Sequence, residues 1–564
     1  MSNDIGQDPR HTPVPAHAWP AALHMGIIVL VGVAVLIPRL GQTQHITGRE
    51  GRHAEIAREM AATHKYVVPF ALGQPYFLKP PLFQWTVVAA FQITRRVDFF
   101  TARLPSVFWT VVGGLAIYLL GRRWLGPRAG LWAALMWFAF PLVYEWARMV
   151  QMDMMLAALV TVGVLLALCS AASPRPAAQW GLWIAACVMA SAGTLAKGPQ
   201  ALFYFLLGAA AIWRVYRRRW LPRPAFLAAG LCVVLLLCGG WVLAAEARYP
   251  GYMQQLIAYQ FGKGLADHQR RVYLYVDQLL VRSAPWALFG IGALYADVRA
   301  LRKRGLTTYT LPAVVFLVAF IAMTLFPSKR EHYLLPILPF WALMIGGFLD
   351  RCATAEGAAG QAEAEAPALG RRSRWWLFEV PLWVILAVPV LALPIAVAVP
   401  QLRATMGIPA IIVGAALMTV SAWGLLSLRR GRHERAIWAI LAATLFGVAA
   451  LDALFVGARY PENTSVAVAR QIGRQIPAGA PVASYGVTHE TLFFALNRPV
   501  AFLYEEAKLR DFLQKPGTRY VLVDVAQAPS LQALAAGAVE KVGQWELDGH
   551  DIWLLRSGAG GANP

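Results

Sequence analysis

The 564-residue sequence has few charged residues. Asp, Glu, Lys and Arg make up only 14% of it, whereas a soluble protein carries about a quarter. Apolar residues make up 58%, and the mean hydropathy is +0.51. This composition excludes a water-soluble enzyme and indicates a membrane protein. The formal net charge is +21, but in a membrane protein the positions of the cations matter more than their sum, so a nucleic-acid partner is not implied.

Several motifs are also absent. The five cysteines include no CxxC pair, which excludes a zinc ribbon and a disulfide framework. HExxH, GxSxG, GxxxxGK[ST] and GxGxxG do not occur, so metalloprotease, acyl-transfer and nucleotide chemistry lack their usual support. The scattered histidines lack ligand spacing, so no metal site is predicted and no cofactor is required. A divalent metal is unsupported. No internal repeat of the kind found in many transporters is visible.

Long apolar runs fill most of the chain. A membrane-crossing helix needs about 20 mostly apolar residues. The candidate runs are 21–40, 104–121, 129–144, 153–171, 179–195, 200–213, 225–246, 276–296, 309–326, 333–350, 376–399, 407–428 and 436–456. A shorter run at 82–93 has the length of an interfacial or re-entrant helix.

The basic loops fix the expected orientation. If residues 82–93 do not cross the bilayer, the arginine clusters at 122–128, 214–223, 299–304 and 429–435 all lie on one side. The positive-inside rule places that side in the cytoplasm. We therefore predict about thirteen spans in the cell inner (plasma) membrane, with a cytoplasmic N-terminus and a periplasmic C-terminus.

Three domains are predicted. Residues 1–20 form a cytoplasmic tail, and residues 21–456 form the helical membrane domain, whose first periplasmic loop with interfacial helices covers about 41–103. Residues 457–564 form a small periplasmic α/β domain, because short strand and helix patterns alternate there. Its expected strands are 482–485 and 520–525, and its expected helices are 466–476, 492–496 and 505–513. The Ala/Glu/Gly tract at 353–370 is typical of a flexible linker.

Ionisable residues at the outer face are the informative ones. Two acids and five cations fall there: Glu50, Asp153, Arg52, Lys79, Lys197, Lys329 and Arg330. Such a set suits a reaction between an anionic, lipid-tethered donor and a hydroxyl acceptor, because cations hold a phosphate and a carboxylate accepts a proton. A second group, Glu55, Arg58 and Glu59, is interpreted as the solvated face of a short helix at 53–61.

Several strings occur in the order found in one family. They are Glu50-Gly51-Arg52-His53 and the residues after it, Pro75-Tyr76-Phe77-Leu78-Lys79-Pro80-Pro81, Arg103-Leu104-Pro105-Ser106, Met152-Asp153, Lys197-Gly198-Pro199 and Lys329-Arg330-Glu331-His332-Tyr333. Over residues 45–345 the chain resembles bacterial membrane glycosyltransferases related to protein O-mannosyltransferases and to the lipid A aminoarabinose transferase. The resemblance implies a GT-C fold, a polyprenyl-phosphate sugar donor and inversion at the anomeric carbon.

The resemblance also implies roles for individual residues. The family's first loop reads Asp-Glu-x-Arg-Tyr, and here Arg49 stands in place of the leading catalytic acid, so the catalytic role passes to the neighbouring Glu50. Asp153 matches the acid of the second outer loop. The donor phosphate is expected to contact Arg52, Lys79, Lys197, Lys329 and Arg330. Further candidate site residues are His53, Tyr76, His268, His332 and Tyr333. Leu78 replaces an acid that could contact a metal.

These features predict an integral membrane glycosyltransferase of the GT-C fold. It would move a sugar from a polyprenyl-phosphate donor to an envelope acceptor, which is lipid A, a glycan or a protein hydroxyl, among the membrane lipids of the periplasmic face. One alternative is a transporter or flippase of lipid-linked sugars, which predicts charges along the spans and repeat symmetry. A second alternative is an envelope scaffold built around the C-terminal domain.

Overall fold

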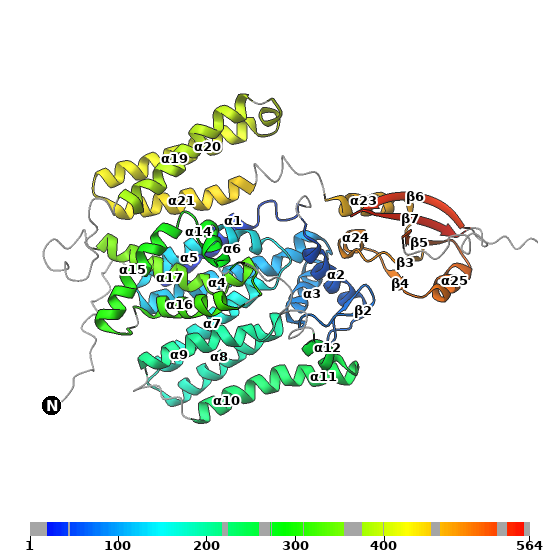
Figure 1. Cartoon of the computed structure of the whole chain (residues 1–564), viewed down its shortest axis with the longest axis horizontal. Helices are drawn as coiled ribbons and strands as arrows, with labels where there is room; N and C mark the ends of the chain where they lie inside the picture. The colour runs from blue at the N-terminus through cyan, green and yellow to red at the C-terminus, as the bar shows by residue number, and fades with distance from the viewer. Residues whose placement is uncertain are drawn as a thin grey trace, which may run out of the picture.

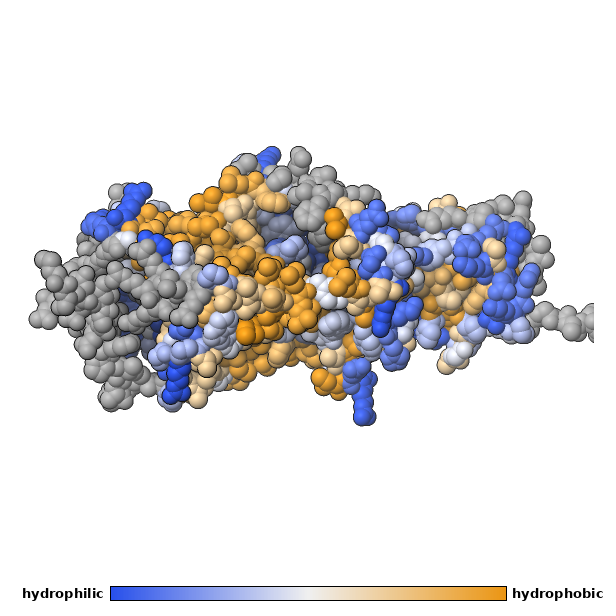
Figure 2. All heavy atoms as spheres, turned by 90° about the horizontal axis from the view of Figure 1, so that it is seen from below, coloured by the Kyte–Doolittle hydropathy of each residue, from blue (hydrophilic) through white to orange (hydrophobic). Residues whose placement is uncertain are grey.

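The computed structural model describes residues 20–42, 46–216, 224–258, 271, 273–307, 309–326, 328–354, 375–398, 400–452, 463–526 and 539–557. A bundle of helices forms the larger part, and a small α/β domain lies at one end of its long axis (Figure 1). Figure 2 shows apolar side chains over the middle of the bundle and hydrophilic ones concentrated over the end that carries the α/β domain. The predicted tail and linker lie outside the described residues, apart from their edges.

The predicted apolar runs form helices. Those of the bundle are α1 (Ala21–Leu36), α4 (Phe99–Trp124), α5 (Pro127–Ala139), α6 (Pro141–Ala147), α7 (Asp153–Ala172), α8 (Pro176–Lys197), α9 (Gln200–Tyr216), α10 (Pro224–Val234), η1 (Leu235–Gly239), α11 (Gly240–Arg248), α14 (Leu274–Arg282), α15 (Ala287–Arg304), α16 (Leu311–Leu325), α17 (Leu338–Thr354), η4 (Trp375–Glu379), α19 (Val380–Ala398), α20 (Pro400–Arg429) and α21 (His433–Leu451). Five helices in the described part are long and apolar enough to cross a membrane, or six if one bent pair counts as a span, and several shorter apolar helices accompany them. The chain is a multi-pass membrane protein.

Two of the predicted runs are broken. The run at 276–296 is not one straight helix, because α14 and α15 meet at an angle of 117°. Pro285 lies in the break, where it cannot continue the hydrogen-bond ladder of a helix. The run at 129–144 divides into α5 and α6 at Phe140, directly before Pro141, and the residue before a proline disfavours helical backbone angles.

The first outer loop is structured. It contains α2 (Gly48–Thr63), a hairpin of β1 (Phe70–Ala71) and β2 (Gln74–Pro75), and α3 (Leu82–Thr94). The Thr47 hydroxyl caps α2 by accepting a hydrogen bond from the Glu50 amide at 3.3 Å. Helix α3 packs against α2, α4 and α8. Both helices were expected from the sequence, while the depth of α3 in a bilayer stays a prediction.

The C-terminal domain is a mixed sheet with helices. Its elements are α23 (Thr464–Gln475), β3 (Val482–Tyr485), α24 (Glu490–Leu496), β4 (Val500–Leu503), α25 (Glu506–Gln514), β5 (Arg519–Asp524), β6 (Val539–Leu547) and β7 (His550–Ser557). The strand order is β4-β3-β5-β7-β6, with β4, β3 and β5 parallel and the other two pairings antiparallel. The predicted α/β class is confirmed, and all five expected elements are present within a few residues. Three further strands, β4, β6 and β7, were not predicted.

The C-terminal domain packs directly on the first outer loop. A Cβ added at Gly51 of α2 would lie 2.0 Å from the Thr491 hydroxyl oxygen of α24, so only glycine permits this approach. Phe494 of α24 packs its ring on Phe99, with centroids 4.6 Å apart. The guanidinium of Arg58 donates a hydrogen bond to the Arg498 carbonyl at 3.2 Å. The outer side of α2 is therefore covered by the C-terminal domain.

This packing corrects one expectation. Glu55, Arg58 and Glu59 are buried and do not form a solvated helix face. Arg58 donates two hydrogen bonds to the Glu55 carboxylate, at 2.6 and 2.7 Å. Burial nevertheless raises the pKa of Glu55 to about 7. Helical spacing predicted that the three side chains share a region of α2. It could not predict their burial, because the domain that covers α2 begins about four hundred residues later in the sequence.

Candidate active site

A buried ion pair lies at the end of the bundle that faces the C-terminal domain. Asp153 is the first residue of α7 and Lys197 is the last residue of α8, and these two helices pack side by side. The Lys197 ammonium donates a hydrogen bond to the Asp153 carboxylate. The two side chains are 5% and 2% exposed. The Tyr333 ring lies 5.1 Å from the Lys197 nitrogen, so that this cation meets both a carboxylate and an aromatic face.

Further cations surround this pair. The half-buried side chain of Lys79, between β2 and α3, is within electrostatic reach of Lys197, Asp153 and Arg330. Burial, together with repulsion from Lys197 and Arg330, lowers the pKa of Lys79 to about 8 despite the attraction of Asp153. Arg330 directly precedes η3 (Glu331–Leu334), and its charge also reaches Lys197. Three predicted phosphate ligands and one predicted acid therefore gather in one place.

Two histidines border the cation cluster. His53 of α2 is buried, and burial, reinforced by the surrounding cations, lowers its pKa to about 3, so its ring is neutral near pH 7. Its Nδ1 is 3.3 Å from the Gln84 amide nitrogen, and Tyr76 meets its ring edge-on at a centroid distance of 6.4 Å. Burial also holds the pKa of His332 well below its ordinary value, and its ring lies on Trp146 at 4.3 Å.

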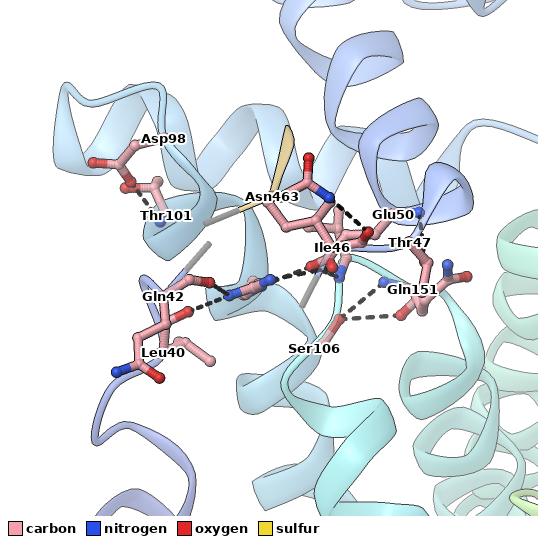
Figure 3. Close-up of polar contacts among 12 residues, drawn as sticks. Leu40, Gln42, Ile46, Thr47, Glu50, Asp98, Thr101, Ser106, Gln151 and Asn463 are labelled. Carbon is pink, nitrogen blue, oxygen red and sulfur yellow. Dashed lines mark hydrogen bonds and ion pairs between the residues drawn. The ribbon is translucent and has the colours of Figure 1, made fainter. Parts of the chain in front are cut away.

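Glu50 has a different environment. Its carboxylate accepts hydrogen bonds from Arg103 Nε at 2.6 Å and Nη2 at 3.1 Å, and from the Val150 amide at 3.1 Å. The same guanidinium donates to the carbonyls of Leu40 and Gln42, at 2.6 and 2.7 Å (Figure 3). Glu50 is 0% exposed. Its oxygens therefore face the junction of α2, α4 and the chain before α7, where Arg103 and the Val150 amide engage them.

Two of the other predicted ligands have protein partners. Arg52 Nε donates to the Glu490 carboxylate of α24 at 2.6 Å. The Lys329 ammonium donates to the carbonyl of Phe326, the C-cap of α16, at 2.5 Å. Lys329 therefore stabilises a helix end, where a cation is favoured. His268 lies outside the described residues.

One site residue was missed by the sequence interpretation. Arg49 is exposed on the first turn of α2, and its charge reaches His53, Lys197 and His332. The sequence marked it only as a departure from the family pattern. Arg49 is three residues before Arg52 and four before His53, and this helical spacing places all three on one face of α2. The spacing in the sequence could therefore have identified Arg49 as a neighbour of the candidate site. Among the described residues, no group of three or more His, Cys, Asp or Glu side chains is placed to hold a metal ion.

Comparisons with known proteins define a class. The family model of dolichyl-phosphate-mannose-protein mannosyltransferases matches residues 78–243. The chain superimposes on a crystal structure of ArnT from Cupriavidus metallidurans bound to undecaprenyl phosphate with a TM-score of 0.70 and 19% sequence identity, covering 96% of this chain and 99% of that one. The predicted fold is confirmed: it is the GT-C fold of membrane glycosyltransferases.

The most informative relatives in sequence share one name. The undecaprenyl phosphate-alpha-4-amino-4-deoxy-L-arabinose arabinosyl transferase of Edwardsiella ictaluri is 27% identical over 501 residues, which are 85% of this chain and 86% of that protein. The protein of that name from Pseudomonas aeruginosa strain UCBPP-PA14 is 29% identical over 328 residues, and the match spans only 57% of this chain and 58% of that protein. The chain is thus similar to the group that its motifs predicted.

Proposed function

We propose that this chain is an integral membrane glycosyltransferase that moves a sugar from a polyprenyl-phosphate donor to an acceptor of the cell envelope. The fold, the order of the motifs and the names of the relatives all support a transferase of this kind. The observation that carries the proposal is the buried Asp153–Lys197 pair with Lys79 and Arg330 beside it. Cations arranged in this way suit a phosphate, which accepts charge-assisted hydrogen bonds.

The cations and the acid have separate roles. Lys79 and Arg330 bind the donor phosphate, while Lys197 holds the Asp153 carboxylate in place. The acceptor oxygen attacks the anomeric carbon, the bond from that carbon to the phosphate oxygen breaks, and its electron pair stays on the polyprenyl phosphate. The acceptor proton passes to Asp153 as general base. Stabilisation of the departing phosphate by the cations lowers the barrier. This single displacement inverts the anomeric carbon.

In this mechanism Glu50 is a positioning residue. A general base must reach the proton it removes, directly or through one water molecule. Both Glu50 oxygens are instead engaged by Arg103, and one of them also accepts from the Val150 amide. Glu50 therefore fixes α2 against α4 and the segment before α7, and so sets where Arg49 and His53 point. This proposed role differs from the catalytic one that the family resemblance implied for Glu50.

The orientation is part of the proposal. The candidate site and the C-terminal domain lie at the same end of the bundle. The described basic segments at 122–128, 299–303 and 429–435 lie at the other end, which the positive-inside rule assigns to the cytoplasm. We infer that the site faces the periplasm from the inner membrane. Cysteines introduced at the exposed positions Thr63, at the end of α2, and Arg123, near the end of α4, should react with an impermeant reagent from opposite sides of sealed vesicles.

The test is transfer by purified protein in lipid nanodiscs. Undecaprenyl phosphate carrying 4-amino-4-deoxy-L-arabinose is the first donor to use, because the relatives bear its name, and lipid A is the first acceptor. Asp153→Asn should lower turnover by roughly 10²- to 10⁴-fold, the range for loss of a general base. Asp297→Asn is the matched control, since Asp297 is equally buried and paired with Arg351, at 2.8 Å, toward the far ends of α15 and α17. Near-normal turnover of Asp153→Asn would contradict the assignment.

A further inference from the structure

An arginine outside the predicted site connects three separate segments. Arg282, the last residue of α14, donates from Nη1 to Glu145 of α6 at 2.7 Å and from Nη2 to Glu331 of η3 at 3.0 Å. The two acids come from segments of the chain that lie 137 and 49 residues from the arginine. Arg282 directly precedes the break between α14 and α15, where the two helices meet at 117°.

The segment held by Arg282 carries two residues of the candidate site. Glu331 lies between Arg330, whose charge reaches Lys197, and His332, whose ring is within electrostatic reach of the Lys197 charge. The segment η3 is a single turn of 3₁₀ helix, and such a turn has weak hydrogen-bond geometry of its own. Its conformation therefore depends on contacts with neighbouring elements.

Those contacts come from the two helices that Arg282 joins. Tyr275 of α14 is buried and has the Arg330 backbone amide as a hydrogen-bond partner. Trp146 of α6 stacks on the His332 ring at 4.3 Å. Helices α14 and α6 thus hold η3 from two directions, and the Arg282 guanidinium connects both helices to it.

We propose that Arg282 is a positioning residue that sets the place of Arg330 in the donor-phosphate site. The inference rests on the proposed function, in which Arg330 binds that phosphate. The three charged side chains are about a third exposed, at 29%, 35% and 36%, and ion pairs of that exposure add little to stability. Loss of the arginine should therefore leave the fold intact and displace η3, and a shift of an ångström at a binding group is enough to lose roughly 10²-fold in activity.

The experiment measures donor binding and turnover separately. Arg282→Gln should weaken the binding of undecaprenyl phosphate in nanodiscs by about ten- to a hundredfold and raise the donor KM accordingly, with a smaller change in kcat. Arg282→Lys, which keeps the charge but not the fork that reaches two acids, should restore part of the loss. In an Arg330→Gln background, Arg282→Gln should have little further effect, because it acts through Arg330.

A matched control is available at the other end of the bundle. Arg128 of α5 also joins two acids from different helices, Asp350 at 2.5 Å and Glu434 at 3.5 Å, and its side chain is 36% exposed. Arg128→Gln should leave donor binding unchanged.

Equal binding of undecaprenyl phosphate by Arg282→Gln and the wild type would overturn the inference. So would an equal loss of binding on Arg282→Gln with and without Arg330. Absence of transfer by the wild type, with the Arg282 effect on undecaprenyl phosphate binding intact, would instead contradict the proposed function.

Discussion

Replacement of Glu50 by glutamine separates a positioning role from a catalytic one. Glu50 is 0% exposed and Arg103 is 5% exposed, and removal of one partner of a buried ion pair costs about 3–5 kcal/mol, because the other charge stays buried. The Leu40 and Gln42 carbonyls continue to accept from Arg103 in the variant, so the lower end of that range is expected. Glutamine keeps the size of the side chain and one acceptor oxygen.

The double variant sharpens the test. Glu50→Gln combined with Arg103→Gln leaves neither charge buried without its partner, so its loss of stability should be smaller than the sum of the two single losses. The free energy of unfolding would be measured by denaturant titration in detergent micelles, with tryptophan fluorescence as the signal. Arg58→Gln makes a useful comparison, since its pair with Glu55 is also buried but lies on another side of α2.

Activity then decides between the roles. Turnover by folded Glu50→Gln protein should stay within about tenfold of the wild type, because the carboxylate contacts no reacting atom in the proposed mechanism, whereas a lost general base costs roughly 10²- to 10⁴-fold. The reasoning is refuted if Glu50→Gln is as stable as the wild type and turns over a thousandfold more slowly. That pattern would return the catalytic role to Glu50 and require α2 to rotate when substrate binds.

Three further outcomes are expected. The ratio kcat/KM for the donor should fall above about pH 8, because the Lys79 ammonium, with a pKa of about 8, loses its charge as the pH rises. Lys79→Arg should remove this alkaline decline, and a decline that persists in Lys79→Arg would show that another group titrates. Arg52 Nε is 2.6 Å from the Glu490 carboxylate, which competes with a donor phosphate for this cation. Glu490→Gln should therefore lower the donor KM by up to about tenfold. A higher KM would show that Glu490 positions the arginine instead. Gly51→Val should expose the C-terminal domain to limited proteolysis, since overpacking costs roughly 1–3 kcal/mol, while Gly48→Val, which meets no atom within 4 Å, should not.

The sequence was most informative where one property recurs along the chain. Apolar runs located the bundle helices, and alternation of short patterns located the elements of the C-terminal domain, because burial on one face leaves a regular trace in the residue order. Breaks were harder to predict. Proline at 285 gave a signal for the bend, but the apolar residues on both sides of it are typical of an unbroken span.

The site shows where sequence reasoning ends. Glu50 and Asp153 are both isolated acids near outer helix ends, and nothing local distinguishes them. The difference arises from Arg103, which is 53 residues from Glu50, and from Lys197, which is 44 residues from Asp153. The burial of Glu55 and Arg58 depends in the same way on the packing of a distant domain. Such tertiary contacts decide which side of α2 faces the site.

Helix position alone does not make Asp153 catalytic. An acid at the start of α7 and a lysine at the end of α8 both complement the helix dipoles, so their pairing would stabilise the bundle in any protein. An ion pair that serves only to stabilise the fold, however, gains no stability from additional cations placed beside its lysine. Here Lys79 lies within electrostatic reach of both Lys197 and Arg330, and the lowered pKa of Lys79 reflects burial together with this repulsion. Such unfavourable clustering is characteristic of functional sites, and an anionic group of the donor would relieve it on binding, which is why the proposed phosphate site is placed here and not at Glu50.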